Sequence, residues 1–242
     1  MSEYLIQDTT LTGIADAIRG KTGGTGPVAV SDMAAQIEGI EAGGGDIDAM
    51  IDRSITEISS NATKVGSYAF YDCTKLKTAN FPMATSIGSY ALYFCPITTI
   101  NLPVVTSINN YAFSQTNLKT ANFPMVTSIG TGAFSGALIT TVNLPVVTSI
   151  GSYVFQGCSR LTTLILRSET IATLGNTATF SNTPIASGTG YIYVPRALLS
   201  DTDATKDYRR ATNWSTFAAQ FRALEDYTVD GTVTGELDET KI

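Results

Sequence analysis

Short apolar triplets recur along the middle of the chain, separated by polar positions. Each triplet has the spacing apolar-x-x-apolar-x-apolar, as in the segment LKTANF at 76–81. Alternation with a period of two is typical of a strand that buries one face and exposes the other. The sequence therefore predicts one short strand per triplet, with its apolar side chains pointing inward. The five triplets are Leu76, Ala79, Phe81; Ile97, Ile100, Leu102; Leu118, Ala121, Phe123; Ile139, Val142, Leu144; and Leu161, Leu164, Leu166.

The triplets recur at a fixed interval, because Pro82, Pro103, Pro124 and Pro145 lie 21 residues apart. The segment LKTANFPMATSIG at 76–88 returns at 118–130 with one position changed. A period of about 20 to 29 residues with this core is the signature of a leucine-rich repeat. No single coil buries its own apolar face, so stacking must supply the core. We expect an α/β repeat solenoid of about five 21–22-residue coils with parallel strands.

A second repeated phrase follows each strand: an Ile-Gly turn, then an Ala-Phe element that often ends in Cys. This whole unit resembles the BspA-like bacterial leucine-rich repeat family, over about residues 54–195. The resemblance implies either a surface adhesin or a phage or prophage tail-associated protein. Three positions depart from the pattern: Thr116 and Ala137 replace the Cys, and Arg167 replaces the fifth Pro. The five phrases are VGSYAFYDC at 65–73, IGSYALYFC at 87–95, INNYAFSQT at 108–116, IGTGAFSGA at 129–137 and IGSYVFQGC at 150–158.

Composition changes divide the chain into further segments on both sides of the repeats. We expect a short helix and the strand SITEI within 46–60 as an entry cap, and one strand followed by two helices after the last coil. Such caps cover the open ends of a repeat stack. The predicted segments are a two-helix docking element at 1–42, a glycine linker and entry cap at 43–60, the solenoid at 61–190, a C-terminal cap at 191–227 and a polar acidic tail at 228–242.

The first 42 residues predict two small amphipathic helices that have too little chain to form a core of their own. The phrases LTGIADAIRGKTGG and AVSDMAAQIEGI resemble the N-terminal segment of tail-fibre-like proteins of phages and prophages in Gram-positive bacteria. That resemblance implies docking to other tail or baseplate proteins, and copies of the same chain are a second partner. The alternative is that the helices fold back onto the entry cap near Ile47 and Met50. The candidate docking residues are Leu11, Ile14, Ile18, Met33, Ile37 and Ile40.

Charge and hydropathy exclude several kinds of partner. The net charge is −6, whereas binding to nucleic acid needs clustered Lys and Arg. No apolar run reaches the about eighteen residues of a membrane span, so we expect no membrane insertion. Residues 1–20 lack the basic and apolar regions of a signal peptide. If the chain is complete at Met1, this favours a phage protein, which is made in the host cytoplasm, over an exported adhesin.

Candidate chemistry is sparse. The chain has no histidine, and its three cysteines occupy the same position in their coils. We therefore expect buried free thiols, with no metal, no cofactor and no catalytic residues, and hence no enzymatic activity. The segment GKTGGTG at 20–26 has Ala15 where a phosphate-binding loop needs Gly, and it predicts an ordinary loop.

Two surfaces are candidates for binding a host-cell receptor, either a surface glycan or a protein. The first is a set of tyrosines on the Ala-Phe elements, since tyrosine offers a rigid apolar ring with a polar tip. The second is the concave strand face with its columns of Thr and Asn. In each case the alternative is structural: ring packing over the turn, or hydrogen-bonded ladders between coils. The residues are Tyr68, Tyr90, Tyr111, Tyr153, Tyr71 and Tyr93 for the first, and Thr78, Thr99, Thr120, Thr141, Asn80, Asn101, Asn122 and Asn143 for the second.

The leading hypothesis is a non-enzymatic phage or prophage tail-fibre or receptor-binding protein, located in the virion tail. It would attach to the tail by its N-terminus and present the repeats to the host. The alternative is a bacterial cell-surface leucine-rich repeat adhesin. A third hypothesis, an ice- or crystal-binding surface, needs Thr-x-Thr motifs, whereas the strands carry Thr-Thr-x-Asn, as at 98–101.

Overall fold

The computed structural model describes residues 55–200, 202–226, 228–229 and 232–233. The chain divides into two compact units, Met1–Gly45 and Asp46–Ile242, and the described residues all belong to the second. In this part of the chain, no helix has the length and apolar content that crossing a membrane requires.

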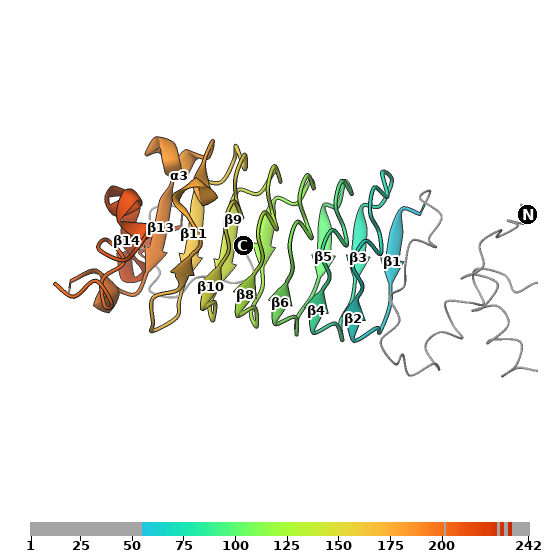
Figure 1. The fold of residues 1–242 in the computed structure, drawn as a ribbon, viewed down its shortest axis with the longest axis horizontal. Helices are drawn as coiled ribbons and strands as arrows, with labels where there is room; N and C mark the ends of the chain where they lie inside the picture. The colour runs from blue at the N-terminus through green and yellow to red at the C-terminus, as the bar shows by residue number, and fades with distance from the viewer. Residues whose placement is uncertain (1–54, 201, 227, 230–231, 234–242) are drawn as a thin grey trace, which may run out of the picture. The chain divides into compact units, whose positions relative to one another are not determined.

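Each coil contributes two short strands, which belong to different sheets and lie in chain order along the stack (Figure 1). The first strands of the coils form a three-stranded and a five-stranded sheet, and the second strands form a six-stranded sheet. The three-stranded sheet contains β1 (Glu57–Ser59), β3 (Thr78–Asn80) and β5 (Thr99–Asn101). The five-stranded sheet contains β7 (Thr120–Asn122), β9 (Thr141–Leu144), β11 (Thr163–Leu166), β13 (Tyr191–Val194) and β14 (Phe221–Ala223). The six-stranded sheet contains β2 (Lys64–Val65), β4 (Ser86–Ile87), β6 (Ser107–Ile108), β8 (Ser128–Ile129), β10 (Ser149–Ile150) and β12 (Thr173–Leu174).

The strand pairing follows the repeat register. All pairs within these three sheets are parallel, and equivalent positions of successive coils face each other, as Thr78 faces Thr99 and Thr120 faces Thr141. The predicted parallel-strand solenoid is therefore confirmed. It has about six coils, not about five, because β1 and β2 form an additional coil before the first predicted triplet.

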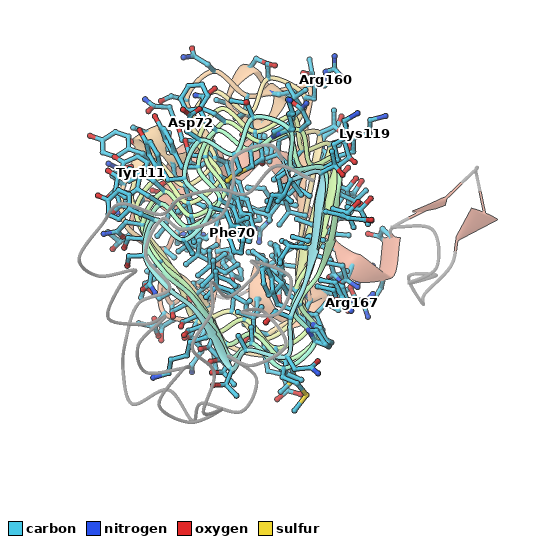
Figure 2. The ribbon with its side chains drawn as sticks, turned by 90° about the vertical axis from the view of Figure 1, so that its right-hand side faces the viewer. Phe70, Asp72, Tyr111, Lys119, Arg160 and Arg167 are labelled. Carbon is cyan, nitrogen blue, oxygen red and sulfur yellow. The ribbon has the colours of Figure 1, made fainter. Side chains whose placement is uncertain are left out.

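The core consists of the predicted inward positions together with the phenylalanines of the Ala-Phe elements. The triplet side chains are buried except Ile100, which is half-buried against the core. Rings from successive coils stack inside it: the centroids of Phe113 and Phe134 are 5.4 Å apart, and those of Phe134 and Phe155 are 5.8 Å apart. Figure 2 looks along the stack and shows Phe70 pointing into this interior. Each coil buries an equivalent side chain here, phenylalanine in most coils and Leu92 in one, and this gives the stack a continuous core.

The Ile-Gly turns allow the coils to approach closely. A Cβ atom on Gly88 would lie 2.4 Å from the backbone nitrogen of Ser67 and 2.5 Å from the carbonyl carbon of Gly66 in the preceding coil. Both distances are too short for any side chain, so only glycine fits there without moving the backbone.

The C-terminal cap combines two more parallel strands with short helical segments. The strand predicted near Pro195 is present as β13, and β14 extends the sheet beyond it. The two predicted helices are 3-10 segments. Trp214 Nε1 donates to the Ala172 carbonyl at 2.7 Å, and the Ala172 N–H donates to the Tyr208 hydroxyl oxygen at 2.9 Å, so the cap is bonded to the last coil. The short segments are η1 (Thr177–Phe180), α3 (Pro184–Ser187), η2 (Arg196–Leu199), η3 (Trp214–Gln220) and η4 (Leu224–Asp226).

Several sequence predictions fall partly or wholly outside the described residues. The docking helices of residues 1–42 and the short helix expected before residue 54 lie there. The expected strand SITEI is represented by β1, three residues long, which begins at Glu57. Within the tail predicted at 228–242, β15 (Thr228–Val229) and β16 (Thr232–Val233) pair antiparallel.

Candidate binding surface

The Ala-Phe element is a tight turn whose amide groups point alternately within the coil and toward the next coil. Tyr68 N donates to the Ser89 carbonyl of the next coil at 2.9 Å, whereas Tyr71 N donates back to the Tyr68 carbonyl at 3.0 Å. This alternation places Tyr68 and Asp72 in the left-handed region, with φ of 60° and 57°. The same hydrogen bonds recur in the following coils, so the turn repeats with the stack.

Left-handed backbone at these turns does not require an aromatic residue. We number the coils in chain order by their Ala-Phe phrases, so that VGSYAFYDC at 65–73 belongs to coil 1 and IGTGAFSGA at 129–137 to coil 4. Tyr68, Tyr90, Tyr111 and Tyr153 all have φ between 54° and 60°, and coil 4 has Gly132 at the same place with φ 63°. A non-glycine residue in this conformation costs about 1–2 kcal/mol. Stacking of aromatic rings offsets about 0.5–1.5 kcal/mol per pair. The tyrosines are therefore retained against an unfavourable backbone preference that glycine would remove.

Five of the six predicted tyrosines come together over the first three coils. In one column Tyr90 stacks on Tyr68 and on Tyr111, with centroids 5.0 Å apart in both pairs. In the neighbouring column Tyr71 stacks on Tyr93 at 5.2 Å. Edge contact between Tyr90 and Tyr93 at 5.5 Å joins the two columns.

Phe94 extends this cluster and was not among the residues singled out from the sequence. Its ring meets the edge of Tyr93 at 4.8 Å, and 49% of the residue is exposed. Like Tyr68, Tyr90 and Tyr111, it has a positive φ, of 59°. The sequence could have drawn attention to Phe94, because the equivalent position in the other coils is polar or glycine. Those residues are Asp72, Gln115, Gly136 and Gly157. We call the cluster the tyrosine ridge; it consists of Tyr68, Tyr71, Tyr90, Tyr93, Phe94 and Tyr111.

Tyr153 lies outside the ridge, although it occupies the same repeat position. Coil 4 separates it from Tyr111, and a Cβ atom on Gly132 would lie 2.3 Å from the Tyr111 ring. The Tyr111 ring therefore covers the glycine of coil 4, which adds no ring of its own to the column. The second column ends at coil 2, since Ser114 of coil 3 and Ser135 of coil 4 follow Tyr93.

The ridge presents ring edges and hydroxyl groups because its ring faces are turned toward one another. Tyr68 and Tyr71 are 48% and 38% exposed. Burial and then the nearby tyrosines raise the pKa of Tyr90 above its usual value, which by itself already keeps the hydroxyl protonated and able to donate near neutral pH. Figure 2 shows Tyr111 at the periphery, on the side of the cross-section opposite Lys119.

The Asn column of the strand face forms hydrogen bonds between coils. Asn101 Nδ2 donates to Asn80 Oδ1 at 2.8 Å, and Asn143 Nδ2 donates to Asn122 Oδ1 at 3.0 Å. These bonds use amide groups that a ligand would otherwise contact. Asn143 is also buried, contrary to the predicted outward column. The structural role of this face is thus supported by its contacts, while the predicted binding role stays a prediction.

The comparisons with known proteins identify the repeat. The family model described as the BspA type leucine rich repeat region matches residues 52–162 and 85–190, in six copies, and these ranges together span more than half of the chain. The chain belongs to the BspA-type leucine-rich repeat family. No match to a curated protein was found.

Among solved structures, similar chains are themselves leucine-rich repeat proteins of bacteria. One from Eubacterium ventriosum shares 24% identity over 50% of this chain and 36% of its own, with a TM-score of 0.46. A leucine rich cell surface protein from Faecalibacterium prausnitzii shares 30% identity over 49% of this chain and 41% of its own, with a TM-score of 0.38. One from Bacteroides ovatus shares 16% identity over 64% of this chain and 66% of its own, with a TM-score of 0.24. The present chain therefore spans less than half the length of the first two.

The sequence suggested two resemblances, and these matches support one of them. The BspA-type repeat is confirmed. The resemblance to phage tail-fibre-like proteins has no support in the family match or in the solved structures above.

The cysteines of the BspA-type repeat are buried free thiols, as predicted. Cys95 Sγ donates to the Phe70 carbonyl at 2.9 Å, and Thr116 in the next coil donates from the same repeat position to the Phe113 carbonyl. A hydrogen bond with Cys73, followed by burial, raises the pKa of Cys95, and burial raises the pKa of Cys158 to about 12. Thiols held protonated in this way are poor nucleophiles and poor metal ligands.

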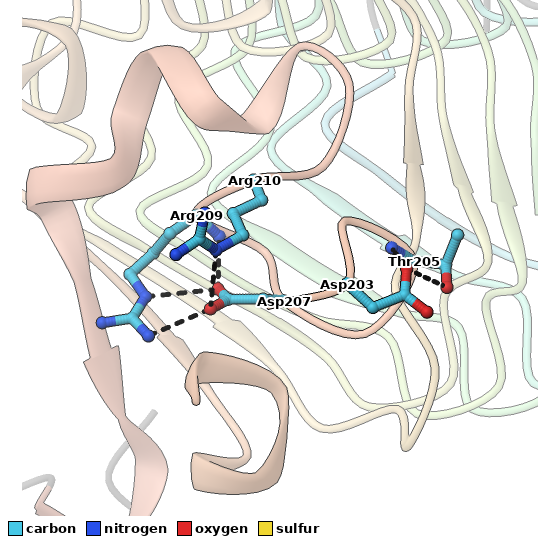
Figure 3. A network of polar contacts seen from close by, with 5 residues as sticks. All are labelled: Asp203, Thr205, Asp207, Arg209 and Arg210. Carbon is cyan, nitrogen blue, oxygen red and sulfur yellow. Dashed lines mark hydrogen bonds and ion pairs between the residues drawn. The ribbon is translucent and has the colours of Figure 1, made fainter. Parts of the chain in front are cut away.

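The ionic groups of the cap serve its own structure (Figure 3). The buried Asp207 carboxylate accepts hydrogen bonds from Arg209 Nε at 3.2 Å and Nη2 at 3.0 Å, and Arg210 Nε lies 4.0 Å away. Asp203 accepts from the Thr205 amide and hydroxyl, which lower the pKa of its carboxyl. Among the described residues, no group of three or more His, Cys, Asp or Glu side chains could hold a metal ion. A BspA-type solenoid is typically a non-catalytic binding scaffold.

Proposed function

We propose that this protein is a non-enzymatic adhesion protein displayed at a bacterial cell surface, where the tyrosine ridge contacts its ligand. The observation that carries the proposal is the ridge itself. Five stacked tyrosines and Phe94 lie on three adjacent coils, and three of the six are more than a third exposed. Rigid aromatic side chains on a fixed scaffold bind with little loss of conformational entropy.

Membership of the BspA-type family supports a surface role, since the family resemblance implied adhesins as one of two classes. The second class, tail-associated proteins, was the leading hypothesis from sequence. It rested on the first 42 residues and on the absence of a signal-peptide pattern, and the comparisons add nothing to it. The cell-surface adhesin is therefore the proposal, and docking through residues 1–42 stays a prediction.

The chemistry of the described side chains supports the non-enzymatic part of this proposal. The thiols are buried with raised pKa values, and the buried carboxylate of Asp207 is held by arginines. A general acid and base need titratable groups within reach of one bound substrate. The ridge supplies neutral hydroxyl groups instead, which suit recognition.

Localisation and adhesion test this proposal together. Antibodies against the solenoid should label intact cells of the producing bacterium, and brief protease treatment of those cells should remove the label without lysis. The purified full chain should bind target cells saturably. Label confined to released phage particles, or an absence of both surface label and cell binding, would contradict the proposal.

A further inference from the structure

One coil builds the turn of the ridge from small residues alone. Coil 4 builds the same turn with Gly132, Ser135 and Gly136 in place of Tyr90, Tyr93 and Phe94. The turn therefore forms without aromatic side chains. Bulky residues held at positive φ are a sign of a functional constraint when the same backbone is built elsewhere without them.

The exposed chemistry of the ridge is neutral and hydroxylated. Each tyrosine hydroxyl can donate one hydrogen bond and accept others, and its orientation adapts to the partner. Residues 61–166 contain one acidic residue, Asp72, and five basic ones. Figure 2 places Lys119 on the opposite side of the cross-section from Tyr111. A strongly charged partner such as nucleic acid or an anionic membrane would find few opposite charges here.

The spacing of the ridge is set by the stack. Equivalent rings in successive coils are 5.0–5.2 Å apart, close to the about 4.7–4.9 Å between paired strands. A ligand that runs along the stack therefore meets the same hydroxyl group, in the same orientation, once per coil. A polymer with its own regular series of hydroxyl groups matches such a surface better than a protein surface of irregular composition.

We propose that the tyrosine ridge binds a neutral polysaccharide chain that lies along the stack. The tyrosine hydroxyls exchange hydrogen bonds with the sugar hydroxyls, and the exposed Phe94 ring packs against the apolar face of a sugar unit. This inference rests on the proposed adhesion function and names the ligand class for it. The polysaccharide crosses coils 1 to 3 and ends its contact at coil 4, where Gly132 and Gly136 leave no ring or hydroxyl to meet.

Affinity electrophoresis of the full chain tests the proposal. At a net charge of −6 the protein migrates toward the anode in a native gel. The gels contain one neutral polysaccharide each, namely laminarin, mannan, xyloglucan or arabinoxylan, with polygalacturonate as an anionic control. We expect at least one neutral polysaccharide to retard the protein and polygalacturonate to leave it unaffected. Retardation by none of the four, or by polygalacturonate alone, would overturn the proposal.

Removal of hydroxyl groups with the rings kept in place separates binding from packing. The variant Tyr68→Phe, Tyr71→Phe, Tyr90→Phe, Tyr93→Phe preserves every stack, and Tyr153→Phe is the matched control outside the ridge. Each lost hydrogen bond weakens binding by a factor of roughly 2 to 10, so affinity should fall about tenfold or more in the ridge variant. Equal retardation of the ridge variant and the wild type would refute the proposal, as would an equal loss in Tyr153→Phe.

The two proposals fail in different ways. Adhesion that survives periodate oxidation of the target cells but is lost after protease treatment of those target cells indicates a protein receptor. That result overturns the polysaccharide and leaves the adhesion function standing. Absence of both surface display and cell binding overturns the proposed function itself.

Discussion

Phe134→Ala should destabilise the solenoid strongly, because this ring lies in the middle of the aromatic core. It is fully buried and stacks on Phe113 at 5.4 Å and on Phe155 at 5.8 Å, with interplanar angles of 6° and 11°. Phe123 from the adjoining strand contacts it at 5.6 Å. Truncation of a buried phenylalanine to alanine costs about 3–5 kcal/mol through lost burial and the cavity that remains. The stacked neighbours on both sides place the expected loss in the upper half of that range.

The assay is urea unfolding of the full chain followed by two probes. Far-UV circular dichroism reports the repeats, and fluorescence of the single tryptophan, Trp214, reports the cap, where its ring lies 6.0 Å from Phe180. Because each coil is stabilised by its neighbours, a defect in coil 4 should lower the midpoint seen by both probes.

Two matched variants calibrate the result. Phe134→Leu places in coil 4 the residue that coil 2 carries as Leu92, and it should cost at most about 1.5 kcal/mol. Phe94→Ala removes the same atoms from an exposed site and should change stability by no more than about 0.5 kcal/mol. If Phe134→Ala is no more destabilising than Phe94→Ala, the ring stack is not the core of this solenoid.

Three further predictions follow from the thiols, the cap and the N-terminal segment. Burial raises the pKa of Cys158 and of Tyr208 to about 12, from 9.0 and 10.0, so their contribution to stability is fully present below pH 9 and is lost as the pH rises toward 12. The free energy of unfolding should therefore fall by about 1.4 kcal/mol per pH unit for each group, from about pH 9 for Cys158 and from about pH 10 for Tyr208, and Cys158→Ala should make the fall shallower. Asp207→Ala should destabilise the cap by about 1–3 kcal/mol in tryptophan-detected unfolding, and an unchanged midpoint would show that the arginine contacts contribute nothing. Deletion of residues 1–42 should leave the solenoid folded while abolishing incorporation into a larger assembly, and a truncated chain that unfolds would identify the segment as a cap.

The repeat could be predicted from the sequence because its apolar positions and turn residues recur in successive coils. The inward positions recur at one period, so a coil that departs from the pattern does not change the assignment made from the other coils. Ile100 is only half-buried, yet its strand was predicted correctly from the repeat. The buried position of the cysteines followed in the same way, since Thr116 and Ala137 share it. Local pattern and global packing agree in such a chain.

Features that depend on the path of the backbone were harder to predict. The alternating amide directions of the Ala-Phe turn, which set the positive φ at Tyr68 and Phe94, leave no hydropathy pattern. The cap depends on contacts between residues far apart in the sequence, such as Tyr208 with Ala172, which are 36 residues apart. The gap at Gly132 was visible in the sequence, but its effect on the ridge became clear only when the ring of Tyr111 was seen to lie over it.

Cell adhesion of a chain whose ridge is interrupted at coil 2 tests the central claim most directly. The variant Tyr90→Gly, Tyr93→Ser, Phe94→Gly gives the turn of coil 2 the residues that coil 4 already uses, so the fold has a native precedent for each change. Tyr153→Gly makes the equivalent change outside the ridge and is the control. We predict that both proteins stay folded, that the control adheres to target cells as the wild type does, and that the variant with the interrupted ridge loses about tenfold or more of its affinity. Adhesion of this folded variant at wild-type strength would contradict the account, because the tyrosines would then only pack the turn.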